Sequence, residues 1–151
     1  MALLVGVGLA IAVAFFARIV GLDRGRSFYP TVMIVVACFY GLFAAISGSA
    51  VALVEEGFGI VGFVALALVG FRSSLWWVVA ALAGHGVYDV FHGHMITNPG
   101  VPVWWPHFCG AYDITAAAIL AWLLQSRRAK AGVGRPPGGD GVRSDSSSPG
   151  P

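Results

Sequence analysis

Residues 75–94 read LWWVVAALAGHGVYDVFHGH, an apolar run whose second half carries three histidines and an aspartate. Such a run has to be buried in protein or in lipid, where an ionisable group carries a large desolvation penalty unless it is paired or binds a ligand. In a helix, His85, Asp89 and His92 are spaced i, i+4 and i+7, so all three project from one face. The stretch therefore predicts a buried helix with a polar site along one face.

The composition of the whole chain indicates a membrane protein. Its 151 residues are 58% hydrophobic and only 11% charged, whereas about 25% of residues are charged in an ordinary soluble domain. A chain this short cannot hide so much apolar surface in one globular core. We expect an all-α fold, an integral membrane bundle of about five transmembrane helices that passes several times through the cell membrane.

Five apolar segments are expected to span, at residues 2–20, 31–46, 51–72, 75–92 and 107–125. The third contains Glu55 and Glu56, and the part that follows them is shorter than the ~20 residues a spanning helix needs. Either that helix begins before the glutamates, or residues 47–59 are partly re-entrant. Residues 1–130 thus form the predicted transmembrane domain. Residues 131–151, rich in Gly, Pro and Ser, predict a disordered cytoplasmic tail.

The basic residues predict the orientation of the bundle. They occur after the first, third and fifth segments, which end on one side of a five-span protein, at Arg18, Arg24, Arg26, Arg72, Arg127, Arg128 and Lys130. By the positive-inside rule the N-terminus lies outside and the C-terminus inside. The non-basic ionisable groups then converge on one outward-facing layer of the membrane.

One interpretation of this layer is a metal site. Imidazole and carboxylate ligands suit a divalent transition metal such as zinc, and His85, Asp89, His92 and Asp113 are the predicted ligands. Glu56 could complete the shell. The same carboxylates, Asp89, Asp113 and Glu56, are the predicted catalytic residues if the ion activates water.

Two other interpretations of the same residues stay open. In a structural polar network, Asp89 would accept a hydrogen bond from His85 or Tyr88, and Asp113 from His92, with no ligand bound. In a proton or ion pathway the same groups would act as a relay.

The spacing His85-x3-Asp89-x2-His92, followed by a Pro/Trp-rich loop and Cys109-x3-Asp113, resembles an uncharacterised family of small bacterial multi-pass membrane proteins with a domain of unknown function. The resemblance covers residues 48–124. An acidic residue that begins the third helix of the family falls on Glu56. The resemblance implies one site, composed of Glu56, His85, Asp89, His92, Cys109 and Asp113. This chain departs from the family at residues 108–110, and at Tyr112, where the family has a second cysteine. No activity comes with the resemblance.

The sequence therefore predicts a multi-pass membrane protein with an outward-facing intramembrane His/Asp/Glu site and an unknown substrate. The preferred hypothesis is a metal-dependent hydrolase of a lipid-like substrate. The alternative is a small transporter or membrane subunit that uses the site as a relay or as a polar network, so whether the protein is an enzyme stays open. We expect the lipid bilayer and a small-molecule or lipid substrate as partners and no nucleic acid, and the oligomeric state is left open.

Overall fold

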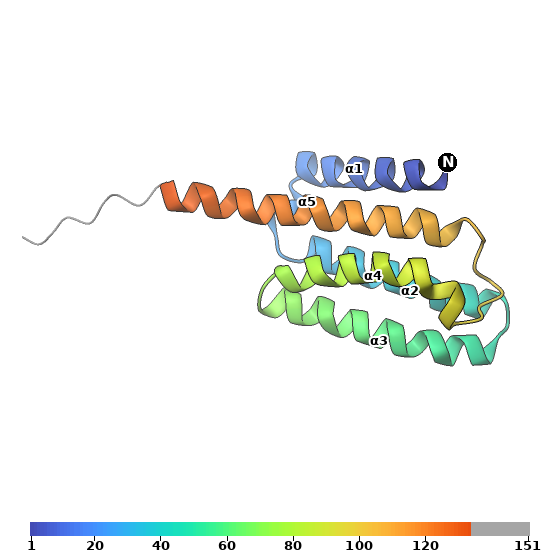
Figure 1. The fold of residues 1–151 in the computed structure, drawn as a ribbon. Helices are drawn as coiled ribbons and strands as arrows, with labels where there is room; N and C mark the ends of the chain where they lie inside the picture. Colours follow the sequence, from blue (N-terminus) through green and yellow to red (C-terminus); the bar gives the residue numbers. More distant parts are fainter. Residues whose placement is uncertain (134–151) are drawn as a thin grey trace, which may run out of the picture.

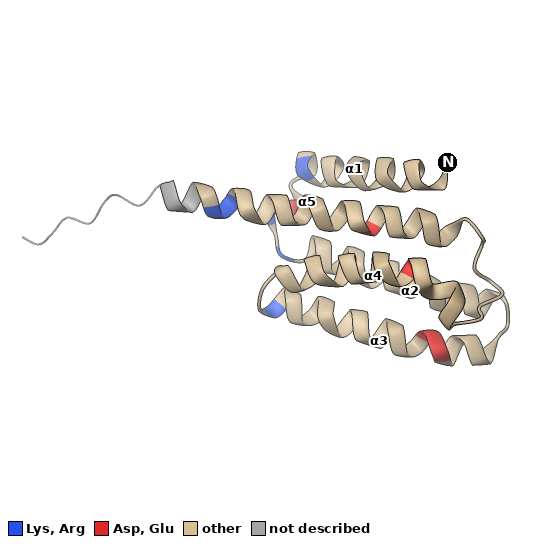
Figure 2. Cartoon of the chain, viewed as in Figure 1, with Lys and Arg blue, Asp and Glu red and all other residues tan. Residues whose placement is uncertain are grey.

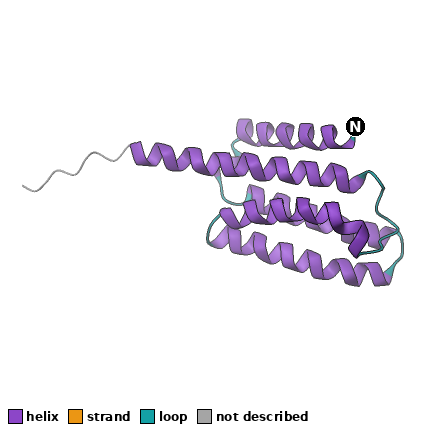
Figure 3. Cartoon of the chain, viewed as in Figure 1, coloured by secondary structure: helices purple, strands orange, loops and turns teal. Residues whose placement is uncertain are grey.

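The computed structural model describes residues 1–133 of the 151 and, within them, contains helices and no strand (Figures 1 and 3). The elements are α1 (Ala2–Val20), the short 3-10 turn η1 (Leu22–Arg24), α2 (Phe28–Ile46), α3 (Ala50–Arg72), α4 (Trp76–Met95) and α5 (Trp105–Val133). The predicted all-α class is confirmed. The predicted tail lies outside the described residues from residue 134 onward, and α5 continues three residues past the expected boundary at 130.

Four of the helices, α1, α2, α3 and the part of α5 up to Ala129, are long and apolar enough to cross a membrane. Helix α4 has a comparable length of 20 residues, but its histidines and aspartate lower its hydropathy. Those polar groups at His85, Asp89 and His92 are buried, whereas Val90 and Phe91 face outward. Helix α4 therefore presents an apolar surface to its surroundings, as a fifth span requires.

Helix α4 lies at the centre of the bundle, where it packs against α5, α3 and α2, while α1 packs along α5 (Figure 1). Small side chains line these interfaces, among them Ala67, Ala81 and Ala116. Without a hydrophobic driving force between helices in lipid, close approach of this kind provides the van der Waals contact that holds a bundle together.

Three helix boundaries settle or correct the sequence predictions. Ser49 caps α3 by accepting a hydrogen bond from the Ala52 amide at 3.2 Å, so the helix begins before the glutamates and the re-entrant alternative is wrong. Helix α4 continues through Gly93 to Met95, past the predicted end at residue 92. Helix α5 begins at Trp105, two residues before the predicted start, because Pro106 is tolerated in a first turn.

Gly6 decides how closely α1 approaches α5. A Cβ atom at Gly6 would collide with the Phe108 carbonyl oxygen, whereas one at Gly8 would meet nothing within 4 Å. We expect Gly6→Leu to destabilise the protein by about 1–3 kcal/mol and Gly8→Leu to leave its stability nearly unchanged. Thermal unfolding in detergent would measure both, and equal effects of the two substitutions would contradict the close packing of α1 on α5.

The charged residues separate by end, as the sequence predicted. The described arginines lie where α1, α3 and α5 finish and in the turn before α2, and Glu55 and Glu56 lie at the opposite end, near the start of α3 (Figure 2). Arg18 pairs with Asp23 at 3.0 Å, and Arg127 donates to the Asp23 carbonyl oxygen at 2.8 Å. The basic end is thus tied together across α1, η1 and α5.

This separation leads to a prediction about orientation, with the basic end in the cytoplasm. A reporter that works only in the cytoplasm should be active when it is fused after Lys130. A reporter that works only outside the membrane should be active when it is inserted between Thr97 and Trp104. Opposite activities of the two fusions would reverse the orientation, and activity on the same side would mean that α5 does not span.

Candidate functional site

The polar face of α4 is completely covered by its neighbours. His85 and Asp89 are each 1% exposed and His92 is 2% exposed, and the three side chains follow the single face that their spacing predicts. They do not form one site. Two groups of side chains, about one to two helical turns apart along α4, surround them.

The first group, which we call the inner cluster, consists of His85, Asp89, Cys109 and Asp113, with one ligand atom from each lying within 4.8 Å of all the others. His85 Nδ1 lies 2.7 Å from Asp113 Oδ2 and 3.7 Å from Asp89 Oδ2. Cys109 Sγ lies 3.8 Å from Asp113 Oδ2. All four residues are buried.

Both carboxylates of the inner cluster have an oxygen atom left over. The Tyr40 hydroxyl on α2 donates a short hydrogen bond to Asp89 Oδ1, and His85 engages Asp113 Oδ2. Among the described residues, Asp89 Oδ2 and Asp113 Oδ1 have no hydrogen-bond partner although both are buried. Each buried polar atom of this kind in a folded protein calls for an explanation.

The second group, the outer cluster, is centred on Glu56 of α3. His92 Nε2 lies 2.7 Å from Glu56 Oε1, and Asn98 Nδ2 donates to the same oxygen at 2.8 Å. The Tyr88 hydroxyl donates to Glu56 Oε2 at 3.3 Å. Both carboxylate oxygens are therefore satisfied, and Asn98 ties the loop after α4 to the bundle.

Tyr40 stands between the two clusters. Its ring stacks on His92, with ring centroids 4.0 Å apart and an interplanar angle of 22°. Its backbone oxygen accepts a hydrogen bond from Asn98 Nδ2 at 3.0 Å, and its hydroxyl donates a hydrogen bond to Asp89. One side chain thus sets the position of groups in both clusters.

The predicted ligands are only partly brought together. His85, Asp89 and Asp113 share the inner cluster, but His92 lies against Glu56. His92 is nearly two helical turns beyond His85 along α4 and faces the start of α3. The pairings foreseen for a polar network also differ, since Asp113 engages His85 and not His92, and Asp89 accepts from Tyr40.

Two residues of the site were missed by sequence reasoning. Tyr40 is the one phenol in the apolar segment 31–46, and Asn98 precedes Pro99 in the loop after α4. A hydroxyl in a long apolar run was the available signal for Tyr40. Of the adjacent glutamates, Glu56 is buried and Glu55 is exposed, in the arrangement that the resemblance implied.

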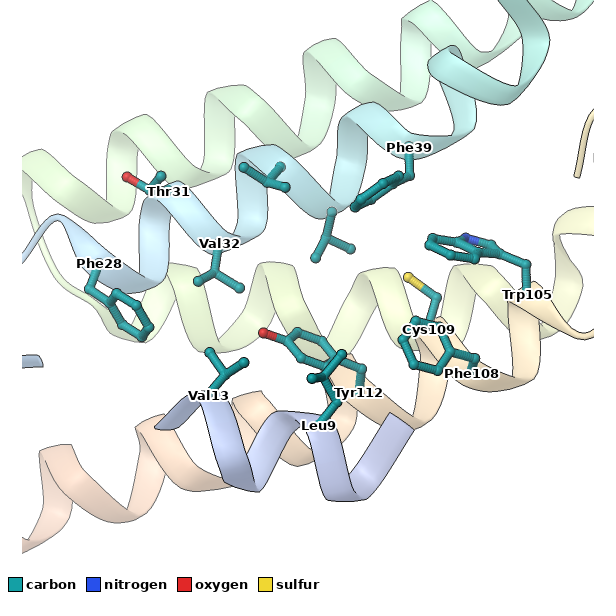
Figure 4. Close-up of a pocket in the computed structure, with 12 residues that line it drawn as sticks. Leu9, Val13, Phe28, Thr31, Val32, Phe39, Trp105, Phe108, Cys109 and Tyr112 are labelled. Carbon is teal, nitrogen blue, oxygen red and sulfur yellow. The ribbon is translucent and has the colours of Figure 1, made fainter. Parts of the chain in front are cut away.

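A cavity adjoins each cluster. An apolar cavity of about 470 Å³ lies between α1, α2 and α5, and Cys109 of the inner cluster forms part of its wall (Figure 4). A more polar cavity of about 330 Å³ lies under the loop after α4, where His92 and Asn98 line it. The inner cluster therefore lies beside an apolar cavity, and the outer cluster beside the polar one.

The donor set of the inner cluster suits a transition metal. One imidazole nitrogen, two carboxylates and one thiol are the ligand types of zinc sites, with bonds of about 2.0 Å to N or O and about 2.3 Å to S. Around a tetrahedral ion these bonds place N and O ligand atoms roughly 3.3 Å apart and a sulfur roughly 3.5 Å from N or O. The separations from His85 to Asp89 and from Cys109 to Asp113 are 3.7 and 3.8 Å, slightly wider, whereas His85 and Asp113 lie at the hydrogen-bond distance of 2.7 Å. The side chains would therefore have to shift slightly to bind an ion. Comparison with models of protein families, with curated proteins and with solved structures finds no match to this chain, and its function therefore has to be inferred from the chemistry of the two clusters.

Proposed function

We propose that this chain is a membrane protein that binds one divalent transition metal ion, zinc by preference, in the inner cluster, and that it is a hydrolase of a lipid-like substrate. One observation carries the proposal. Asp89 and Asp113 are buried side by side, share a single imidazole, and each has an oxygen atom without a partner among the described residues.

The charge of the two buried carboxylates favours a bound cation. Two carboxylates at this depth carry a desolvation cost that is offset only by opposite charge or by good hydrogen bonds. A protonated His85 could compensate one of them, since it contacts both at 2.7 and 3.7 Å. A divalent ion compensates both, and it gives each carboxylate a partner in addition to its present hydrogen bond.

The hydrogen bonds around the inner cluster also suit a bound ion. Metal-binding side chains are commonly held by partners outside the ligand shell, which orient them and tune the ion. Tyr40 plays that part for Asp89, because it occupies Oδ1 and leaves Oδ2 on the side of His85. The hydrogen bond between His85 and Asp113 would be exchanged for the ion, since metal binding to such ligands releases protons.

The surroundings support a reaction class. A divalent ion in such a site polarises a carbonyl or phosphoryl group and makes water a better nucleophile. The cluster lies beside an apolar cavity through Cys109 and is connected by Tyr40 to groups that line a more polar one. An amphipathic substrate has an apolar part that suits the first cavity and a polar part that suits the second. Asp89 and Asp113 keep their proposed catalytic role, and Glu56, which lies across Tyr40, is assigned a positioning role.

A proton or ion relay is the second candidate. It is favoured by the run of polar groups from Asn98 and Glu56 through Tyr40 to Asp89 and the inner cluster. The run is not continuous, because Tyr40 contacts His92 through its ring face. A relay also leaves the two free carboxylate oxygens without a role, and we therefore rank it below metal binding.

The metal content of purified protein tests the proposal. We expect about one zinc ion per chain, with loss of the ion in His85→Ala, because the imidazole is the one neutral nitrogen ligand of the cluster. His94→Ala and His107→Ala are matched controls, since both side chains are exposed, and both should keep the ion. Wild-type protein that binds no transition metal after incubation with zinc would overturn the metal proposal and leave the relay as the better account.

Cys109→Ala separates a catalytic site from a structural one. Catalytic zinc sites have three protein ligands and one open position, whereas structural sites are closed by four. If the position of Cys109 beside the cavity is the open one, the variant retains zinc through His85, Asp89 and Asp113. Loss of zinc equal to that in His85→Ala would identify a closed structural site and contradict the hydrolase.

A further inference from the structure

The apolar cavity between α1, α2 and α5 is long and follows the helices. Its wall along α2 extends from Phe28 to Phe39, which lie about 16 Å apart along the helix axis. Leu9 and Val13 of α1 and Phe108 of α5 close the other sides (Figure 4). The volume of about 470 Å³ falls within the roughly 300–1,000 Å³ of small-molecule sites.

The packing of the bundle explains the cavity. Helix α1 packs along α5, whereas α2 packs against α3 and α4. Between these two groups of helices the side chains of Val13, Val32 and Phe108 face a common space (Figure 4). All three helices that border this space are long and apolar enough to cross a membrane, so the cavity lies at the depth of the lipid chains.

The chemistry of the wall selects the occupant. A buried water needs two to four polar partners, and the surface that faces the cavity is almost entirely apolar, although Thr31 and Tyr112 carry hydroxyl groups. Its length of about 16 Å lies along the helix axes, in a bilayer whose hydrocarbon core is ~30 Å thick. An acyl chain of a bilayer lipid has the same direction and the same chemistry, and it is the apolar molecule that surrounds the protein on every side.

One end of the cavity reaches the inner cluster. Trp105 and Phe39 lie at that end, and Cys109 follows Trp105 by one helical turn. Tryptophan is enriched at the level of lipid headgroups. A lipid whose headgroup lies at the level of Trp105 would therefore have the join between headgroup and chain close to Cys109, whose thiol contacts Asp113 at 3.8 Å.

We propose that this cavity binds one acyl chain of a membrane glycerophospholipid and presents the ester end of that chain to the inner cluster. The role of the lipid as substrate rests on the proposed function, but the binding of the chain does not. Val13 and Val32 then act as the residues that leave room for the chain, one on each side of the cavity.

A photoactivatable lipid tests the binding. The full chain is placed in bilayer discs of phosphatidylcholine that contain a small fraction of phosphatidylcholine with a diazirine in its acyl chain. After illumination, we expect the label to concentrate on peptides of α1, α2 and α5 that line the cavity. We expect loss of this label in the double variant Val13→Phe and Val32→Phe, which fills the cavity. Val61→Phe on α3 is the matched control, because Val61 is 69% exposed away from the cavity, and it should keep the label.

Labelling spread evenly over lipid-facing positions, including those near Val61 and Val90, would overturn the inference, and the wild-type map alone suffices for this if the double variant fails to fold. Zinc content is measured in the same samples and in His85→Ala. Labelling of the cavity in protein that binds no zinc would support the acyl-chain site and contradict the proposed function. Bound zinc together with evenly spread labelling would support the metal site of the proposed function and contradict the acyl-chain site.

Discussion

Removal of metal by a chelator should lower the melting temperature of the wild-type protein by roughly 10 °C and leave that of Asp113→Asn unchanged. The size follows from linkage, since a ligand at a thousand times its dissociation constant stabilises the folded state by about 4 kcal/mol. Asp113 is fully buried, and the isosteric amide can still hydrogen-bond His85, so its packing survives. The variant loses one of two charged ligands and with it the stabilisation by the ion.

His107→Ala controls for effects of the chelator on the bundle itself. His107 is exposed at the start of α5, so this variant should show the wild-type drop in melting temperature. Readdition of zinc should restore the wild-type value and leave Asp113→Asn unaffected. A wild-type melting temperature that does not respond to chelator or to zinc would mean that the carboxylates are satisfied without an ion.

Replacing Glu56 by alanine should cost about 3–5 kcal/mol of unfolding free energy, the range found when one partner of a buried ion pair is removed. Glu56 is 1% exposed, and its carboxylate accepts from Asn98 and Tyr88 and engages His92. The substitution removes the partner of Tyr88 and His92, leaves Asn98 with the Tyr40 backbone oxygen alone, and opens a space between α3 and α4.

The neighbouring Glu55→Ala is the matched control, since Glu55 has the same chemistry and lies on the exposed side of the same turn. Its effect should stay within about 0.5 kcal/mol. Denaturant unfolding in mild detergent would measure both variants. Equal destabilisation by the two substitutions would contradict the outer cluster. Zinc bound to folded Glu56→Ala would show that the two clusters act separately.

The sequence was sufficient for the helices and for the face of α4 that carries the buried polar residues. Long apolar segments bounded by Arg, Pro and Gly mark α1 to α4 and the start of α5 to within a few residues, because a backbone in lipid has to satisfy its own hydrogen bonds within each segment. The end of α5 was missed, since the helix continues from the predicted end at residue 125 to Val133. The i, i+4, i+7 spacing placed His85, Asp89 and His92 on one face. The sorting of basic groups to one end followed from the order of the segments alone.

Which side chains meet across the bundle depended on the packing of the helices. Periodicity determines the face of a helix, but the axial and rotational register between two helices comes from side-chain packing at their interface. That register puts Asp113 opposite His85 and Glu56 opposite His92, which divides one predicted ligand set between two clusters. The same register brings Tyr40 from a segment with no predicted role to the point where both clusters meet. The space beside Cys109 likewise exists because α1 follows α5 while α2 follows α3, a choice of neighbours that no single segment encodes.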